Sequence, residues 1–305
     1  MTSRKAVRPQ ADGLSIYLEE RRKLVERALA RCLPAATVRP ATIHRAMRYS
    51  LLAGGKRLRP ILTLAAAEAC NAKDLSNILP AACAVELIHT YSLVHDDLPC
   101  MDDDDLRRGS PTSHKVFGEG VAVLAGDALL TRAFRLLATV KPPRRYALSQ
   151  ILAETAEAAG SLQLIAGQVA DLEAEGNKLS IRDVRFIHER KTAAMIVLSV
   201  RLGAMIAGAT PGQLKALTDF GSSLGLAFQI IDDILDVTST SEQLGKSAGK
   251  DLKAVKATYP AVIGLESSRK EADLLTKKAL GALKKIGSQS IRLVQIAEQL
   301  MIRSS

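Results

Sequence analysis

The amino-acid sequence predicts an all-α protein, folded as a single large helical domain over residues 1–305. Apolar residues recur at three- and four-residue spacing along the whole chain, which is the pattern of helices with one buried face. No alternation of apolar and polar residues is long enough to predict a useful strand. Aromatic residues make up only 3% of the chain, with no Trp. Ala, Leu and Ile are abundant instead, and this mixture favours helices over sheets.

The first four helices are predicted from spacing and from their breaks. Residues 14–32 carry Leu, Val and Ala at helical spacing, after a basic segment, residues 1–13, that we expect to be flexible. Residues 41–53 repeat the spacing after a proline and end at a glycine pair. Segments 60–71 and 78–98 are long and rich in Ala, Leu and Ile, which is typical of buried helices.

The later helices are separated by Gly, Pro and Asn in the same way. No Gly/Ser-rich linker and no change of composition marks a domain boundary. The remaining predicted helices are residues 119–139, 146–175, 180–208, 211–237, 260–281 and 287–302.

The net charge points to an anionic partner. Lys and Arg exceed Asp and Glu by 42 − 32 = +10, and the pI is near 9.5. A nucleic acid, a membrane surface or a phosphorylated small molecule would each fit this excess. The scarcity of aromatic residues disfavours a single-strand nucleic-acid binder, which stacks bases on such rings.

The cysteines and the hydropathy pattern favour a reducing compartment. The four cysteines form no CxxC pair, which indicates reduced thiols. The basic start of the chain has no apolar segment of a secretory signal behind it, and no apolar stretch reaches 18 residues. We therefore expect a cytoplasmic protein with no stable membrane insertion.

Two acidic clusters stand out. The first aspartate motif, residues 95–105, follows an apolar helix, and the second aspartate motif, residues 232–236, follows another. A solvated acidic loop is the alternative interpretation. Carboxylates placed twice at the end of apolar helices argue against it, because buried carboxylates need cations.

The residue types indicate which cation is bound. Asp232 and Asp236 are four residues apart and share a helix face. Oxygen ligands without Cys or clustered His favour Mg²⁺ or Mn²⁺, and neither motif has the EF-hand pattern. Asp96 and Asp102, six apart, would not share a face of a regular helix, whereas Asp103 would; Pro99 makes that geometry uncertain.

Basic residues accompany the acidic clusters. A glycine pair is followed by Lys56, Arg57 and Arg59, and the first aspartate motif is followed by two arginines. Guanidinium and ammonium groups bind phosphate oxygens, and no GxxxxGK[ST] sequence indicates a P-loop. Together with the carboxylates, these groups predict a cradle for diphosphate.

This constellation resembles the trans-isoprenyl diphosphate synthases, which include the farnesyl and geranylgeranyl diphosphate synthases. The resemblance covers about residues 40–265 and implies the isoprenoid synthase fold, with helices around a central cavity. The matching segments, in the family's order, are GGKRLRP (54–60), HDDLPCMDDDDLRRG (95–109), GQVADL (167–172), KT (191–192), FQIIDDILD (228–236) and GKSAGKDLKAVKATYP (245–260).

The resemblance also assigns roles to individual residues. It implies a cofactor of Mg²⁺, three ions for which Mn²⁺ can substitute, and a homodimer. The ions would be held by Asp96, Asp102 and Asp232, with Asp97, Asp233 and Asp236 as supporting ligands or their neighbours. The residues expected to bind the allylic diphosphate are Arg107, Lys191, Thr192, Gln229, Lys246 and Lys256. The residues expected to bind isopentenyl diphosphate are Lys56, Arg59, His89 and Arg108.

The implied reaction needs no protein nucleophile. Asp96, Asp102, Lys191 and Asp232 are the expected catalytic residues, because charge develops on the departing diphosphate. The allylic C–O bond ionises, the alkene of isopentenyl diphosphate attacks the carbocation head-to-tail, and a proton is lost to the released diphosphate. The surrounding apolar helices would exclude water.

Product length is predicted from the helix before the first aspartate motif. Tyr91 lies five residues before Asp96, about 7.5 Å along a helix axis. In this family a large aromatic near this position stops elongation, and Tyr91 with Ser92 is similar to bacterial farnesyl synthases. Plant-type geranylgeranyl enzymes carry a smaller or flexible residue there. We predict a C15 product, with C20 as the alternative, and an ordinary core tyrosine as the other interpretation of Tyr91.

Three other functions are less well supported. A class I terpene cyclase normally has a different second metal motif and an aromatic-lined pocket. A non-catalytic regulatory subunit usually lacks one aspartate motif, and this chain keeps both. A helical nucleic-acid binder would need a recognition motif, which is missing.

Overall fold

The all-α prediction is confirmed. The computed structural model describes residues 10–238 and 258–302, and within them the only strands are two residues long. Within these residues no helix combines the length and apolar character needed to cross a membrane. The first half contains α1 (Gln10–Cys32), α2 (Ala41–Leu51), α3 (Leu58–Ala69), α4 (Leu79–Asp96), β1 (Leu106–Arg107), β2 (Ser110–Pro111), α5 (Ser113–Phe117) and α6 (Glu119–Leu137).

The second half completes the helical domain. It contains α7 (Leu148–Ala159), α8 (Leu164–Ala174), α9 (Ile181–Ile187), the π-helix η1 (His188–Ala193), α10 (Ala194–Ile206), α11 (Pro211–Thr238), α13 (Tyr259–Ile263), α14 (Leu265–Leu283), the 3₁₀-helix η2 (Gly287–Ser290) and α15 (Ile291–Ile302).

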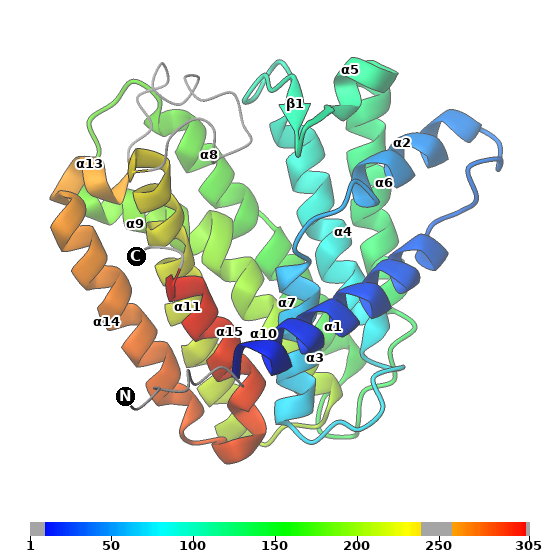
Figure 1. The fold of residues 1–305 in the computed structure, drawn as a ribbon. Helices are drawn as coiled ribbons and strands as arrows, with labels where there is room; N and C mark the ends of the chain where they lie inside the picture. Colours follow the sequence, from blue (N-terminus) through cyan, green and yellow to red (C-terminus); the bar gives the residue numbers. More distant parts are fainter. Residues whose placement is uncertain (1–9, 239–257, 303–305) are drawn as a thin grey trace, which may run out of the picture.

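The core is organised around three helices. Helix α4 packs against α3 and α6, α10 packs against α3, α4 and α11, and α11 packs against α14. In Figure 1, α14 stands at one side of the bundle and α2 with α6 at the other, and α1 crosses in front of α3. Leu87 and Ile88 of α4 and Ile230 of α11 are fully buried. The helices that carry the two aspartate motifs are therefore held by apolar packing along their length.

Several predicted boundaries were wrong. The helix expected over 146–175 is two helices, because the chain bends at Gly160, where a Cβ would lie 2.6 Å from the carbonyl oxygen of Ala156. The helix expected over 260–281 is divided at Gly264, which has a φ of +81° that favours glycine. Between the helices expected over 78–98 and 119–139, the chain forms the short elements β1, β2 and α5, which were not predicted.

Candidate active site

The first aspartate motif begins where α4 ends. The backbone N–H of Asp102 donates to the carbonyl oxygen of Asp96 at 2.9 Å, so residues 97–101 form a closed loop. The N–H of Asp103 donates to Leu98 at 3.1 Å, and Asp103 is exposed with a φ of 48°. The helical spacing that favours Asp103 does not apply here, because the helix has already ended at Asp96.

Asp96 is the buried carboxylate of this motif. Burial raises its pKa to about 6; Lys191 opposes the rise, and the charges of Asp102 and Asp97 add to it. Lys191, from a distant part of the chain, therefore lies within electrostatic reach of Asp96. A carboxylate crowded by two others is stabilised by a cation, and all the donors are oxygens, so the site fits Mg²⁺.

Asp97 and Arg107 form an ion pair within the motif. The Nε of Arg107 donates to Asp97 at 2.5 Å, and its Nη2 donates to Asp104 at 3.2 Å. Asp97 is buried, and burial raises its pKa while Arg107 opposes the rise. Arg107 is thus oriented by two carboxylates before any phosphate is bound.

The second aspartate motif divides its carboxylates between two environments. Asp232 is half-buried and Asp236 is exposed, whereas Asp233 is buried. Burial lowers the pKa of Arg59, and the charges of Glu86 and Asp232 oppose that shift. Asp232 of α11 therefore lies within electrostatic reach of Arg59 of α3.

The Lys191–Thr192 pair is carried by the π-helix η1. The Nζ of Lys191 lies 2.6 Å from Asp171 of α8, and the hydroxyl of Thr192 donates to Gln229 of α11 at 2.8 Å. Two residues expected to bind the allylic substrate, Thr192 and Gln229, are thus in direct contact. A π-helix within a longer helix frequently marks a functional site.

Two glycines let η1 approach its neighbours. A Cβ at Gly167 of α8 would lie 2.3 Å from the backbone nitrogen of Lys191. A Cβ at Gly225 of α11 would lie 2.6 Å from the Cα of Ala193. Because any side chain would push these helices apart, the two glycines set the position of Lys191.

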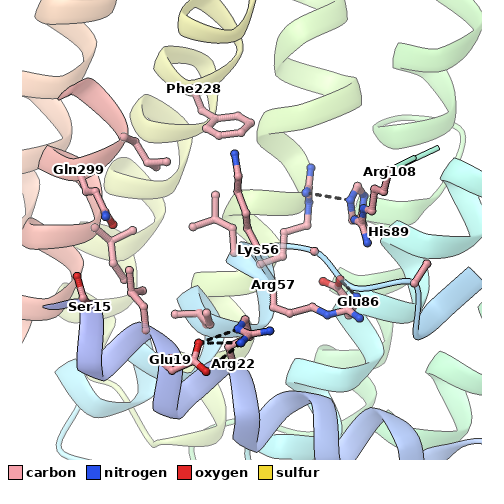
Figure 2. Close-up of a pocket in the computed structure, with 18 residues that line it drawn as sticks. Ser15, Glu19, Arg22, Lys56, Arg57, Glu86, His89, Arg108, Phe228 and Gln299 are labelled. Atoms are coloured by element: carbon pink, nitrogen blue, oxygen red, sulfur yellow. Dashed lines mark hydrogen bonds and ion pairs between the residues drawn. The ribbon is translucent and has the colours of Figure 1, made fainter. Parts of the chain in front are cut away.

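The four residues expected to bind isopentenyl diphosphate line one cavity. It has a volume of about 630 Å³, and Figure 2 shows Lys56, His89 and Arg108 among the side chains around it. Nη1 of Arg59 lies 3.4 Å from Nε2 of His89. Burial lowers the pKa of His89 well below 6.5, and Arg59 and Arg108 lower it further. The imidazole is therefore neutral, and the cavity's cations are arginine and lysine.

The glycine pair before Lys56 holds Arg108. Nη1 of Arg108 donates to the carbonyl oxygen of Gly54, and a Cβ at Gly55 would lie 2.6 Å from that same nitrogen. Gly55 also has a φ of +126°, which favours glycine. The glycine pair is thus needed to hold Arg108, which follows the first aspartate motif.

Sequence reasoning missed the buried ion pair behind this cavity. Nη1 of Arg57 lies 2.7 Å from Glu86, and the two side chains are only 1% and 3% exposed. Arg57 also donates to the carbonyl oxygen of Leu51 at 2.8 Å. The only sequence signal was the position of Glu86, three residues before His89 on the same helix face.

Tyr91 packs toward α6. Its ring is buried and meets the imidazole of His95 edge-on, with centroids 5.7 Å apart. His95 in turn lies 3.0 Å from the carbonyl oxygen of Val123 and fills the space beside Gly126. Burial raises the pKa of Tyr91 to about 12, and Asp96 contributes to the rise. The hydroxyl of Ser92 donates to the backbone carbonyl oxygen of His89 at 2.9 Å.

Two predicted site residues lie outside the described part of the chain, and one group was not predicted. Lys246 and Lys256 belong to residues 239–257. Asp103, Asp105 and His114 each place one potential ligand atom within 4.8 Å of the others. Nothing in the sequence spacing connected His114 to the acidic residues.

Comparisons with known proteins agree with this geometry. The chain is 47% identical, over 97% of its length and 81% of the relative's, to "Heterodimeric geranylgeranyl pyrophosphate synthase large subunit 1, chloroplastic" of Arabidopsis thaliana. It is 45% identical to the farnesyl diphosphate synthase of Geobacillus stearothermophilus, with 94% of this chain and 97% of the relative covered.

A solved structure and a family model extend the agreement. The apo structure of an FPP/GFPP synthase from Zymomonas mobilis matches with a TM-score of 0.83 and 33% identity, covering 96% of this chain and 100% of that one. The Polyprenyl synthetase family model matches residues 40–296. With both aspartate motifs in place on α4 and α11, the chain belongs to the polyprenyl synthetase family and is a short-chain trans-prenyltransferase.

Proposed function

We propose that this protein condenses isopentenyl diphosphate with dimethylallyl or geranyl diphosphate, with Mg²⁺, to give farnesyl diphosphate. The observation that carries the proposal is a juxtaposition. Lys191 and Arg107 lie within electrostatic reach of Asp96, and Arg107 also reaches His89. His89 lies 3.4 Å from Arg59, which Asp232 reaches as well, so carboxylates and cations from several helices lie in one region. Such a space suits a diphosphate held between metal ions and basic side chains.

In this proposal one set of residues binds the allylic substrate and another set binds isopentenyl diphosphate. Lys191, Thr192, Gln229 and Arg107 hold the allylic diphosphate beside Asp96, Asp102 and Asp232, which hold Mg²⁺. Mg²⁺, when bound, supplies positive charge toward the departing diphosphate. Isopentenyl diphosphate occupies the cavity of about 630 Å³ that α1, α3, α4, α11 and α15 line.

Neutral His89 and the arginines around it orient isopentenyl diphosphate for attack. The imidazole offers a hydrogen bond without adding charge, while Lys56, Arg59 and Arg108 supply the charge. After the allylic C–O bond ionises, the alkene attacks head-to-tail and the proton leaves to the released diphosphate. The apolar side chains of α4 and α11 keep water from the carbocation.

The buried ring of Tyr91 supports a C15 product. It lies on the helix that ends in Asp96 and is close enough for the Asp96 charge to raise its pKa. A chain growing along α4 from Asp96 would meet this ring. Geranylgeranyl names are more frequent than farnesyl names among the similar curated proteins, and this favours C20 as the second candidate.

A product assay tests the proposal. The purified protein is incubated with Mg²⁺, isopentenyl diphosphate and each allylic primer, and the product length is measured. We expect C15, lengthened by Tyr91→Ala and unchanged by Tyr91→Phe, which keeps the ring. A dominant C20 product would contradict the role of Tyr91 but keep the chemistry. A folded protein that condenses no primer would instead be a regulatory subunit.

The proposal includes a homodimer, as the sequence resemblance implies, and a cytoplasmic location, as the cysteines and the hydropathy pattern indicate. Sedimentation of the purified chain measures the oligomeric state, and a monomer at assay concentrations would contradict the first part. Fractionation of the producing cells tests the second.

A further inference from the structure

The carboxylate of Asp233 is enclosed by hydrogen-bond donors. Nε2 of His188 lies 2.8 Å from Oδ2 of Asp233, and the backbone N–H of Tyr259 donates to the same oxygen at 3.0 Å. His188 is 7% exposed and Asp233 is 4% exposed. Because an ionised carboxylate only accepts, Nε2 carries the proton of this bond.

The same carboxylate closes a ring of side chains between two helices. Nε2 of Gln229 donates to Oδ1 of Asp233 at 3.4 Å, and Oε1 of Gln229 accepts from Thr192 at 2.8 Å. His188 and Thr192 both belong to η1, and Gln229 and Asp233 both belong to α11. Each helix thus contributes two members, and the ring fixes their relative position.

Tyr259 protects this ring from water. Its own ring stacks on the imidazole of His188, with centroids 5.4 Å apart and an interplanar angle of 28°, and Tyr259 is 1% exposed. A hydrogen bond in such an apolar setting is stronger than one in water, and losing one partner leaves the other unsatisfied. The arrangement is therefore rigid, because His188 and Asp233 each satisfy the other's buried polar group.

Two sequence neighbours of this ring are residues that the proposed function places at the metal ions and the allylic diphosphate. Asp232 adjoins Asp233, and Lys191 adjoins Thr192. We propose that His188 is a positioning residue, which through Asp233 anchors the second aspartate motif to η1 so that Asp232 keeps its place for Mg²⁺. The inference rests on the proposed function. It assigns Asp233 to anchoring, whereas Asp232 beside it holds the cation.

Two substitutions of His188 separate anchoring from packing. His188→Phe keeps a ring to stack on Tyr259 but removes the donor, and His188→Gln restores a donor near the position of Nε2. Tyr146→Phe is the matched control, since the buried Tyr146 hydroxyl donates to the carbonyl oxygen of Ala209 at 2.7 Å, far along the chain from either motif.

The readouts are kcat, KM for isopentenyl diphosphate, the Mg²⁺ concentration for half-maximal rate, and the rise in Tm on adding Mg²⁺ with inorganic pyrophosphate. For His188→Phe we expect kcat to fall and the Mg²⁺ midpoint to rise, each by about 10- to 100-fold, as for other residues that orient metal ligands. KM for isopentenyl diphosphate should stay within about twofold, since the ring does not line that cavity. The Tm rise should shrink in His188→Phe and return in part in His188→Gln.

A wild-type Mg²⁺ midpoint and a full Tm rise in His188→Phe would overturn the inference, as would equal effects in Tyr146→Phe. If His188→Phe does not fold, His188→Leu, which removes the donor without placing a second ring beside Tyr259, decides in the same way. A wild-type protein without product would contradict the proposed function, whereas the pyrophosphate-dependent Tm rise would still test His188.

Discussion

The backbone N–H of Asp102 donates to the carbonyl oxygen of Asp96 at 2.9 Å. This bond brings the backbones of two aspartates six residues apart next to each other, although a regular helix would place them on different faces. The five residues between them project as a loop, with exposed Pro99 and Cys100 near its tip. The residues between Asp96 and Asp102 thus lie outside α4, and the helix stays regular up to its end.

Neighbouring aspartates of this loop should respond differently to the same substitution. We expect Asp102→Asn to lower kcat by about 10²- to 10³-fold, because a ligand to the charge-stabilising cation is lost. Asp103→Asn, at an exposed residue whose carboxylate lies near Asp105 and His114, should keep most of the activity. Steady-state rates at saturating Mg²⁺ measure both, and equal losses would contradict the assignment.

Gly225→Ala should displace η1. The added Cβ has no room beside Ala193, so Lys191 moves, and we expect a fall in kcat of more than about tenfold from misplacement alone. Gly281→Ala in α14 is the control, since nothing lies within 4 Å of its Cβ position. It should raise stability by about 0.5–1 kcal/mol. Wild-type activity in Gly225→Ala would show that α11 and η1 can move apart at this contact without displacing Lys191.

Gly55→Ala should act on one substrate only. The new Cβ would push away the guanidinium of Arg108, so KM for isopentenyl diphosphate should rise about tenfold, the value of one charged hydrogen bond, while KM for the allylic primer changes little. Gly176→Ala also places a side chain at a residue of positive φ, +73°, with nothing near its Cβ. If both variants raise the same KM, backbone strain explains the effect and displacement of Arg108 does not.

Breaking the ion pair of Arg57 and Glu86 should be costly. Glu86→Gln leaves a buried guanidinium without its counter-charge, and we expect the free energy of unfolding to fall by about 3–5 kcal/mol. The double variant Arg57→Met with Glu86→Leu should regain a large part of that loss. Urea unfolding of the three proteins measures the difference, and additive losses would contradict a mutual pairing.

His89 should make the substrate-free protein less stable in acid. Its pKa in the folded state lies well below 6.5. Above pH 6.5 His89 is neutral in both the folded and the unfolded state. Below pH 6.5 the unfolded chain binds a proton at His89 and the folded chain does not, so the free energy of unfolding falls as the pH is lowered. His89→Gln should remove up to about 1.4 kcal/mol per pH unit from this slope. Unfolding measured from pH 7.5 to 5 tests this, and parallel slopes would refute it.

The fold was largely predictable because helical spacing is a local property. The apolar repeats of α4, α10 and α11 reported both their existence and their burial. Single glycines such as Gly160 and Gly264 were harder, since a glycine inside a helical pattern can be tolerated or can end the helix. The π-helix η1 left no trace, because its residues fit an α-helix equally well.

For the candidate site, the sequence predicted which residues lie together in one cavity but not the contacts among them. Lys56, Arg59, His89 and Arg108 were expected together, and one cavity holds all four. The adjacent residues Asp232 and Asp233 look alike in the sequence, yet only Asp233 is withdrawn into hydrogen bonds with His188. That difference depends on what packs against α11, which no spacing rule contains.

The π-helical turn at residues 188–193 makes its length as important as its composition. A π-helix has one more residue per hydrogen-bonded turn than an α-helix. Deleting one residue there would restore ordinary α-helical hydrogen bonding, and the lost residue would come from the wide turn that holds His188, Lys191 and Thr192. The helix would become more regular, and these three side chains would lose their present spacing around the helix axis. In this segment the number of residues therefore matters as much as the identity of each side chain.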